Sequence, residues 1–535
     1  MTNAGGAKEP SSPNEGKAAG IARPWLLLFA ALALGFVCEA LLHGQPPGLG
    51  YAAAAAVAVA VWVGIGLAMG LRPSASGIAL LALILFFSAM VAVRASPALQ
   101  VLNVLTGAGL ALLMAAVYLR PANGAGLRGG LPGMSLTDDA TALVISSVAL
   151  AVQPFILIFG DLPRARRNSG GRGKVAPVLL GLILAVPLLL VFGALFAAAD
   201  AVFAGYVRQM FAWLTDFPQL VGRVVLSLIL AWLALGLARR AFTASAKPFS
   251  LEDLVSLDFL RLGAAPAIVV LALVDALFLG FVAVQAVYLF GGVDTLARTG
   301  MTYSEYARRG FFELVMVAAI VLGLILLFDW LARFADRRAR LAISLLHGLL
   351  VLLTLVILAS ALIRMRIYQV EFGLTELRFY TTAFMAWLAV VLIWAVVTVL
   401  PLHSPYGTGR RRFAFGALVA VLALVALLDL ANPDAWIARV NFDRAAAGVG
   451  QPLDAAYLTT GLSLDAVPVN AAGLAKVTDP TLRTEIACGL RAQAKDLETL
   501  APRLTWRGAN LGIVSGRRAL ASVRPEWEGV RCPEQ

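Results

Sequence analysis

Two short stretches of the sequence concentrate the charged and aromatic side chains that could bind a ligand. The first holds Tyr303, Glu305, Tyr306, Arg308, Arg309 and Glu313. The second holds Arg364, Arg366, Tyr368, Glu371, Glu376, Arg378 and Tyr380. Arginine can hold a carboxylate or phosphate through two parallel hydrogen bonds. If the two stretches converge, they form a polar cleft suited to an anionic head group or a peptide. The alternative is a pair of interfacial helices, with tyrosines at head-group depth and Arg–Glu pairs that hold the fold.

Single ionisable residues inside long apolar runs form a second group of candidates. Asp275 lies near the middle of the run 264–290, where an acidic residue is costly and normally faces the interior of a bundle. It could relay protons or bind a cation, or it could pair with Arg223 of the neighbouring run. Four other acidic residues lie near the ends of runs and are expected to reach water: Glu39, Asp200, Asp329 and Asp429.

Cysteine and histidine are too few to suggest a metal centre or a nucleophilic enzyme. The chain has three of each, without metal-ligand spacing, and the histidines form no catalytic set with a serine or cysteine. We therefore expect no metal, no cofactor and no catalytic residue. Cys488 and Cys532 both lie near the C-terminus and could form one disulfide.

The elements that carry these residues are long apolar segments. Hydrophobic residues make up 60% of the 535 residues and charged residues only 14%. The apolar residues come in runs of about 20 residues, the length at which a helix spans about 30 Å of hydrocarbon. A helix also satisfies its own backbone hydrogen bonds, as a bilayer requires. The sequence predicts an all-α, polytopic transmembrane bundle with spans near 25–42, 50–70, 77–93, 99–119, 141–160, 176–198, 219–238, 264–290, 311–330, 341–363, 379–402 and 413–430. Gln153-Pro154 interrupts the run 141–160, so the number of crossings is eleven or twelve.

The distribution of basic residues between the runs predicts the orientation. The segments 161–175, 239–263, 331–341 and 403–412 together carry 16 Lys and Arg, whereas the alternating segments 199–218, 291–310 and 364–378 carry seven. Basic loops stay in the cytoplasm, so the C-terminus is expected outside it. The net charge of +12 lies almost entirely in the helical part. A nucleic-acid partner is therefore not expected.

Composition divides the chain into three parts. Residues 1–24 read as a disordered tail, 25–430 as the bundle, and 431–535 as a small water-exposed α-helical domain outside the cytoplasm. Asn432-Pro433-Asp434 signals a turn at the start of this C-terminal part. Trp436 and Trp506 are expected to pack in its core.

Several short motifs connect the chain to a known family. They are 302–314 (TYSEYARRGFFEL), 364–368 (RMRIY), 372–378 (FGLTELR, with Phe372 where Tyr is usual), Asn432-Pro433-Asp434, 453–458 (LDAAYL) and 462–468 (LSLDAVP). These resemble a family of multi-pass bacterial membrane proteins known by a domain-of-unknown-function label, the 4153/4173 type. The resemblance implies family membership and no particular activity.

Three functions fit these observations. The first is a binding or scaffold protein of the bacterial inner membrane, with a lipid, a peptide or an envelope protein as partner. The second is a secondary transporter that uses Asp275. The third is an enzyme similar in outline to lipid-linked glycosyltransferases, although the segment Leu41–Gly50 lacks the acidic residue that such an enzyme needs.

Overall fold

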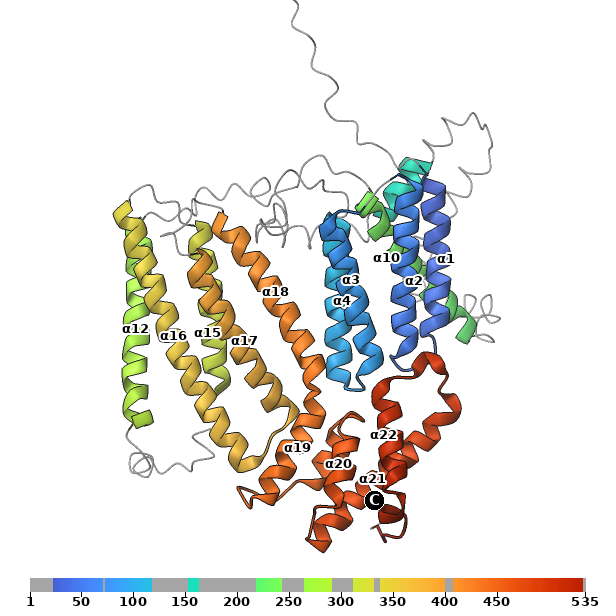
Figure 1. Cartoon of the computed structure of the whole chain (residues 1–535). Coiled ribbons are helices and arrows are strands. Elements are labelled where there is room, and N and C mark those ends of the chain that lie inside the picture. Colours follow the sequence, from blue (N-terminus) through green and yellow to red (C-terminus); the bar gives the residue numbers. More distant parts are fainter. Residues whose placement is uncertain are drawn as a thin grey trace, which may run out of the picture.

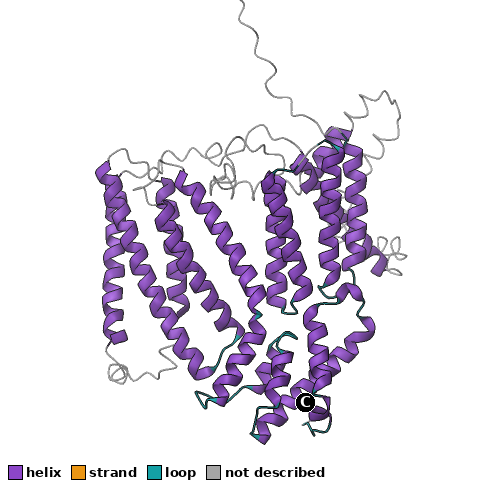
Figure 2. Ribbon diagram, in the orientation of Figure 1, coloured by secondary structure: helices purple, strands orange, loops and turns teal. Residues whose placement is uncertain are grey.

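The computed structural model describes residues 23–70, 73–117, 153–162, 218–242, 264–290, 311–331, 337–399 and 408–532. Helices dominate these residues and no strand occurs among them (Figures 1 and 2). The predicted all-α class is therefore confirmed.

The apolar runs form long helices at the positions that the sequence predicts, although α16 extends well beyond the predicted run 341–363. They are α1 (Pro24–Leu42), α2 (Leu49–Ala68), α3 (Ala75–Val93), α4 (Pro97–Val117), α10 (Pro218–Phe242), α12 (Ala264–Phe290), α15 (Phe311–Leu331), α16 (Arg337–Phe372), α17 (Glu376–Val399) and α18 (Thr408–Ala431). Nine helices of the described part are long and apolar enough to cross a membrane, and α15 adds the shorter apolar stretch Leu314–Phe328. Large side chains such as Leu273 and Leu277 are 67% and 71% exposed. Such surfaces suit contact with lipid, so the chain is membrane-embedded.

Two predicted spans lie wholly or largely outside the described residues. The run 176–198 is not described, and of 141–160 only the end is. Residues 153–162 are helical, with a π-helical turn at Leu157–Asp161. Gln153-Pro154 lies in this helical stretch, and whether it interrupts the run 141–160 stays a prediction because the preceding residues lie outside the described part.

The membrane part contains two hydrophobic clusters. The first joins α12, α15, α16 and α17, and the second joins α1 to α4, the 153–162 segment and α10. Helix α18 contributes to both, through Phe413 in the first cluster and Val425 in the second. It therefore connects the two halves of the bundle.

The residues after α18, which we call the tail, form a smaller helical unit. It comprises α19 (Pro433–Ala446), the π-turn Tyr457–Gly461, α20 (Val467–Leu474), α21 (Pro480–Leu500), the 3-10 turns Ala501–Arg503 and Trp506–Gly508, α22 (Leu511–Ser522) and α23 (Arg524–Glu528). These elements share a core of their own, which includes Ile437, Leu490 and Ile513. The expectation that Trp436 and Trp506 pack in that core is wrong, because they are 52% and 60% exposed.

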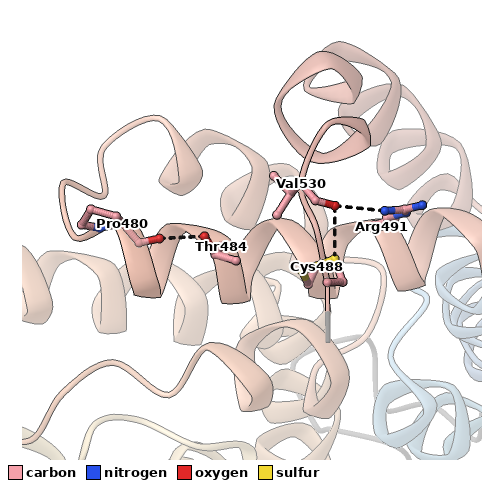
Figure 3. The surroundings of a disulfide bond; sticks show 6 residues. Pro480, Thr484, Cys488, Arg491 and Val530 are labelled. Atoms are coloured by element: carbon pink, nitrogen blue, oxygen red, sulfur yellow. Dashed lines mark hydrogen bonds between the residues drawn. A yellow bond between two sulfur atoms is a disulfide. The ribbon is translucent and has the colours of Figure 1, made fainter. Parts of the chain in front are cut away.

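A disulfide ties the end of the tail to its longest helix. Cys488 of α21 and Cys532 are bonded, with Cα atoms 5.7 Å apart (Figure 3). Beside the bond, Arg491 donates a hydrogen bond to the carbonyl of Val530 over 3.1 Å. The last described residues are thereby held against α21.

The tail lies against one end of the bundle, where α1 and α18 finish and α17 begins (Figure 1). The first residues of α1 lie at the opposite end. The two ends of the described chain thus lie at opposite ends of the bundle. An odd number of crossings, such as eleven, gives this arrangement, whereas twelve would place both ends on the same side.

The second polar stretch is not the loop that the spacing suggested. Helix α16 continues to Phe372, and only residues 373–375 separate it from α17. Gly373 has a φ of +79°, a conformation in which a Cβ would be strained and would meet the Asn441 amide. The stretch is therefore a helical hairpin with a tight turn.

Candidate functional site

Polar side chains gather where the tail meets the bundle. This region, which we call the junction, is formed by the α3–α4 turn with the first turns of α4 (residues 94–103), the α16–α17 turn (371–378), the α18–α19 connection (429–434), Asn441, and residues 454–465 of the tail. Six of these polar side chains are buried and need hydrogen-bond partners: Ser96, Asn103, Asp429, Asp434, Asn441 and Asp465. The partners join segments far apart in the sequence.

Asp465 of the tail holds the α3–α4 turn. Its Oδ2 atom accepts hydrogen bonds from the backbone N–H groups of Ala95 and Ser96, over 2.8 and 3.2 Å. The side chain is buried, and burial raises the pKa of the Asp465 carboxyl, while the two N–H donors and Arg94 act in the opposite direction. A charged acceptor thus satisfies two donors that the turn leaves free.

Arg94, Asn103 and Asp429 connect the α3–α4 hairpin to the end of α18. Arg94 donates to the carbonyl oxygen of Asp429 over 2.6 Å, which caps the C-terminal end of α18 with a cation. The Asn103 amide donates to Asp429 Oδ1 over 2.8 Å. Asp429 is fully buried, so the expectation that it reaches water is wrong. These two contacts hold the α3–α4 turn against the end of α18.

Asn432-Pro433-Asp434 forms the start of α19. Asn432 is the N-cap residue with a φ of +51°, and its side chain accepts a hydrogen bond from the N–H of Ala435. Asp434 is fully buried and accepts from the N–H of Ser463 over 3.2 Å. The half-buried carboxyl of Glu376, the first residue of α17, lies near that of Asp434, so the two like charges repel each other.

The α16–α17 turn is gripped from the tail by two further contacts. Asn441 accepts from the N–H of Leu374 over 2.8 Å and donates to its carbonyl over 2.7 Å. The N–H of Glu376 donates to the phenol oxygen of Tyr457 over 2.8 Å. Burial raises the pKa of that phenol. The turn therefore has a fixed position against α19 and the π-turn.

Two of the predicted polar-cleft residues of the second stretch, Tyr368 and Arg378, serve the hairpin itself. Arg378 stacks over the ring of Tyr368 at 4.2 Å and donates to the carbonyl oxygens of Phe372 and Gly373. Glu371 accepts from the side chain of Gln451 over 3.3 Å. Arg364 is buried in α16, whereas Arg366 is exposed.

The first polar stretch lies almost entirely outside the described residues. Tyr303, Glu305, Tyr306, Arg308 and Arg309 lie outside the described residues, as does the side chain of Glu313 at the start of α15. The convergence of the two stretches into a cleft, in which Arg308 or Arg309 would approach Glu371 or Glu376, therefore stays a prediction.

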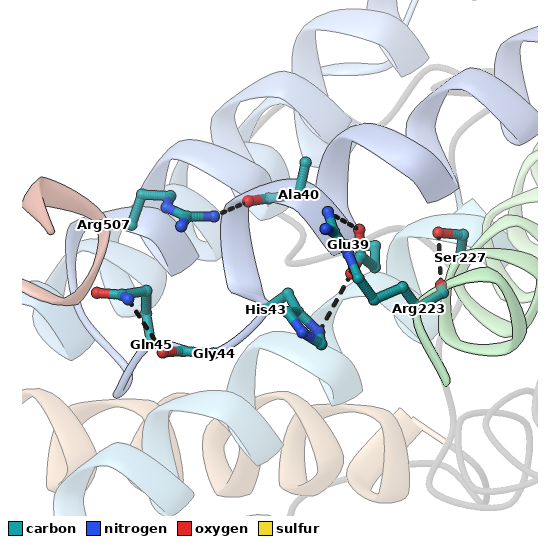
Figure 4. Close-up of polar contacts among 8 residues, drawn as sticks. All are labelled: Glu39, Ala40, His43, Gly44, Gln45, Arg223, Ser227 and Arg507. Atoms are coloured by element: carbon teal, nitrogen blue, oxygen red, sulfur yellow. Dashed lines mark hydrogen bonds and ion pairs between the residues drawn. The ribbon is translucent and has the colours of Figure 1, made fainter. Parts of the chain in front are cut away.

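The intramembrane ion pair differs from the one considered from the sequence. Arg223 of α10 does not pair with Asp275 but with Glu39 of α1, over 2.8 Å, and His43 also contacts Glu39 (Figure 4). Glu39 is only 3% exposed, so it does not reach water as expected. Close helix packing explains the pairing, because a Cβ on Gly35 would collide with Ser227 and Ala231 of α10.

Asp275 remains the most unusual residue of the bundle. It is 3% exposed, and neither carboxylate oxygen has a hydrogen-bond partner among the described residues. An isolated buried carboxylate is expected to take up a proton or a cation. No three His, Cys, Asp or Glu side chains of the described part lie close enough together to hold a metal ion.

The junction also contains residues that the sequence did not single out as a site. Asn441 and Tyr457 each hold the α16–α17 turn, and Asp465 holds the α3–α4 turn. For Tyr457 and Asp465 the available signal was their place in the short motifs 453–458 and 462–468, whereas Asn441 lies in none of the motifs. Glu376, Asp434, Tyr457 and Asp465 all belong to such motifs, and the structure brings them to one region.

These features define a polytopic helical membrane protein with a tail clamped to one end of the bundle. The model of the family described as "Domain of unknown function (DUF4153)" matches residues 80–473, and the chain belongs to this family. The match covers the junction from α3 to α20. No curated protein and no solved structure matches the chain.

Proposed function

We propose that the protein is a membrane-anchored binding or scaffold protein, in which the bundle holds the tail in a fixed orientation for a ligand of the cell envelope. The observation that carries this proposal is the junction. The side chains of Asp465, Asn441 and Tyr457 accept hydrogen bonds from the backbone of both helical hairpins and so attach the tail to both at once. A tail that served only as a covalent extension would need no such contacts.

The tail belongs on the extracytoplasmic side in this proposal. Basic residues mark the opposite ends of the helices: Arg239 and Arg240 finish α10, and Arg337 and Arg338 begin α16. Positively charged ends remain in the cytoplasm during insertion. A bacterial inner-membrane location agrees with this orientation.

The ligand surface in this proposal is the tail together with the exposed side of the α16–α17 hairpin. Arg366 and Glu371 are exposed there, and the stretch 303–313 would complete a cleft with Tyr, Arg and Glu side chains. Such a surface suits a peptide, a lipid head group or an envelope protein with charged groups of both signs.

A complementation experiment tests the proposal. In the source organism without its own copy, a flexible Gly/Ser linker inserted after Ala431, combined with Asp465→Ala, should abolish rescue of the envelope defect. The same linker inserted after the exposed Thr478 should leave rescue intact. Membrane abundance of each variant is measured by immunoblot. The scaffold role would be refuted if the variant with the linker after Ala431 and Asp465→Ala gave full rescue at the abundance of the intact chain.

Secondary transport is the second candidate, because Asp275 is buried without a partner among the described residues. In this alternative, Asp275→Asn abolishes rescue while protein abundance is kept. Proteoliposomes with an internal pH-sensitive dye give a direct readout. Transport predicts proton flux that Asp275→Asn removes, whereas the scaffold proposal predicts no flux in either protein.

A further inference from the structure

A shallow groove lies on the tail beside the start of α22. Its volume is about 320 Å³, and it is lined by Leu504, Thr505, Trp506, Ala509, Ile513, Val514, Arg517 and Arg518. The lining is apolar at one end, where the indole of Trp506 is 60% exposed. It is cationic at the other end and contains no acidic side chain.

The groove lies at the level of the membrane surface. Thr505 donates two hydrogen bonds to Gln45 in the turn between α1 and α2. Arg507 donates to the carbonyl of Ala40, in the last turn of α1 (Figure 4). The N–H of Leu49, the first residue of α2, donates to the carbonyl of Ala509 over 2.9 Å. Since these residues end two membrane-spanning helices, Trp506 lies where tryptophan normally meets lipid head groups.

The two arginines are available for a ligand. Arg517 and Arg518 are exposed, and neither forms a hydrogen bond or an ion pair within the described chain. They follow Ile513 and Val514 by four residues on α22, so each lies one turn further from the membrane than the apolar lining. This order, from apolar to cationic, is the order of groups along a phospholipid from acyl chain to phosphate.

We propose that this groove binds an anionic phospholipid of the surrounding bilayer. Arg517 and Arg518 hold the phosphate through charge-assisted hydrogen bonds. Trp506 and Val514 contact the glycerol and the upper acyl chains. The bound lipid bridges the tail and the membrane beside α1 and α2, independently of any partner of the scaffold.

Native mass spectrometry of the full chain in detergent tests this proposal. Phosphatidylglycerol and phosphatidylcholine are titrated separately, and the fraction of lipid-bound protein is measured. The intact chain should prefer phosphatidylglycerol. The double variant Arg517→Gln/Arg518→Gln should bind it about tenfold more weakly, because two charged contacts are lost. Trp506→Leu should lower the affinity for both lipids without changing the ratio of the two affinities.

The matched control removes two exposed arginines elsewhere on the tail, as Arg439→Gln/Arg531→Gln. This control has the same net charge as Arg517→Gln/Arg518→Gln, but it should bind phosphatidylglycerol with the affinity of the intact chain. An equal loss in the control, or an unchanged affinity in Arg517→Gln/Arg518→Gln, would overturn the site. Competition by free glycerol phosphate at concentrations comparable to those of the lipid would also overturn it, since it would identify a site for a soluble anion.

Discussion

Asp465 is the side chain through which the tail holds the α3–α4 hairpin. It accepts from two backbone N–H groups, and its own burial would be costly without them. Arg94, Asn103 and Asp429 repeat this logic between the hairpin and α18. At this scale the junction is a set of buried polar groups whose hydrogen bonds join distant segments.

Removal of the Asp465 carboxylate should therefore loosen the tail. Asp465→Ala leaves the N–H groups of Ala95 and Ser96 without an acceptor, and we expect a loss of about 2 kcal/mol in the free energy of unfolding. Chemical denaturation in mild detergent measures the loss. Asp496→Ala, which removes an exposed carboxylate of α21, is the control and should change stability little.

The raised pKa of Asp465 gives a pH dependence with a defined sign. A carboxyl whose pKa is higher in the folded than in the unfolded state stabilises the fold fully below the unfolded value, and the contribution is lost as the pH rises through the folded value. The stability of the intact chain relative to Asp465→Asn should thus increase as the pH falls from 7 toward 4. Denaturation curves of the intact chain and of Asp465→Asn, each at pH 7 and pH 4, measure this difference in stability. A difference that decreases at pH 4 would contradict the raised pKa of Asp465.

At the scale of elements, the sequence predicted the helices well and their polar contacts poorly. The runs 264–290, 311–330 and 413–430 agree with α12, α15 and α18 because lipid requires long, apolar, self-bonded segments. Contacts such as Asn441 with Leu374 or Arg223 with Glu39 depend on which helices are neighbours. The charges of the loops do not show which helices are neighbours. The continuous helix through Arg364–Phe372 also shows that a high density of charged residues does not by itself identify a loop.

The disulfide is an element-level constraint on the tail. It closes a loop between residues 44 positions apart, and the chain-entropy model assigns such a closure about 4 kcal/mol. Cys488→Ser/Cys532→Ser should lower the stability of the tail by an amount of that order, which limited proteolysis and denaturation can measure. The serine variant should behave like the intact chain under reducing conditions; a difference that persists there would point to lost packing instead.

At the scale of the whole molecule, α18 connects two hydrophobic clusters and leads directly into the tail. The junction then contacts helices of both clusters, through the α3–α4 and α16–α17 turns. The tail thus serves as a brace across one end of the bundle. This arrangement is what a protein needs to present a surface in a fixed orientation.

The side of the membrane can be tested with reporters. Alkaline phosphatase fused after Gln535 should be active, and green fluorescent protein at the same position should not fluoresce, because the basic helix ends lie at the opposite face. A fusion at the end of α18, after Ala431, should give the same pattern. Fluorescence with inactive phosphatase would reverse the orientation of the entire bundle.

The fixed attachment of the tail is tested most directly by a distance distribution. Spin labels at the exposed positions Leu377 on α17 and Lys495 on α21, in a chain with Cys38→Ala and the disulfide intact, report the position of the tail relative to the bundle. Double electron–electron resonance should give one narrow distribution in nanodiscs, and Asp465→Ala should broaden it. A broad distribution in the intact chain, unchanged by Asp465→Ala, would contradict the clamp and with it the scaffold proposal.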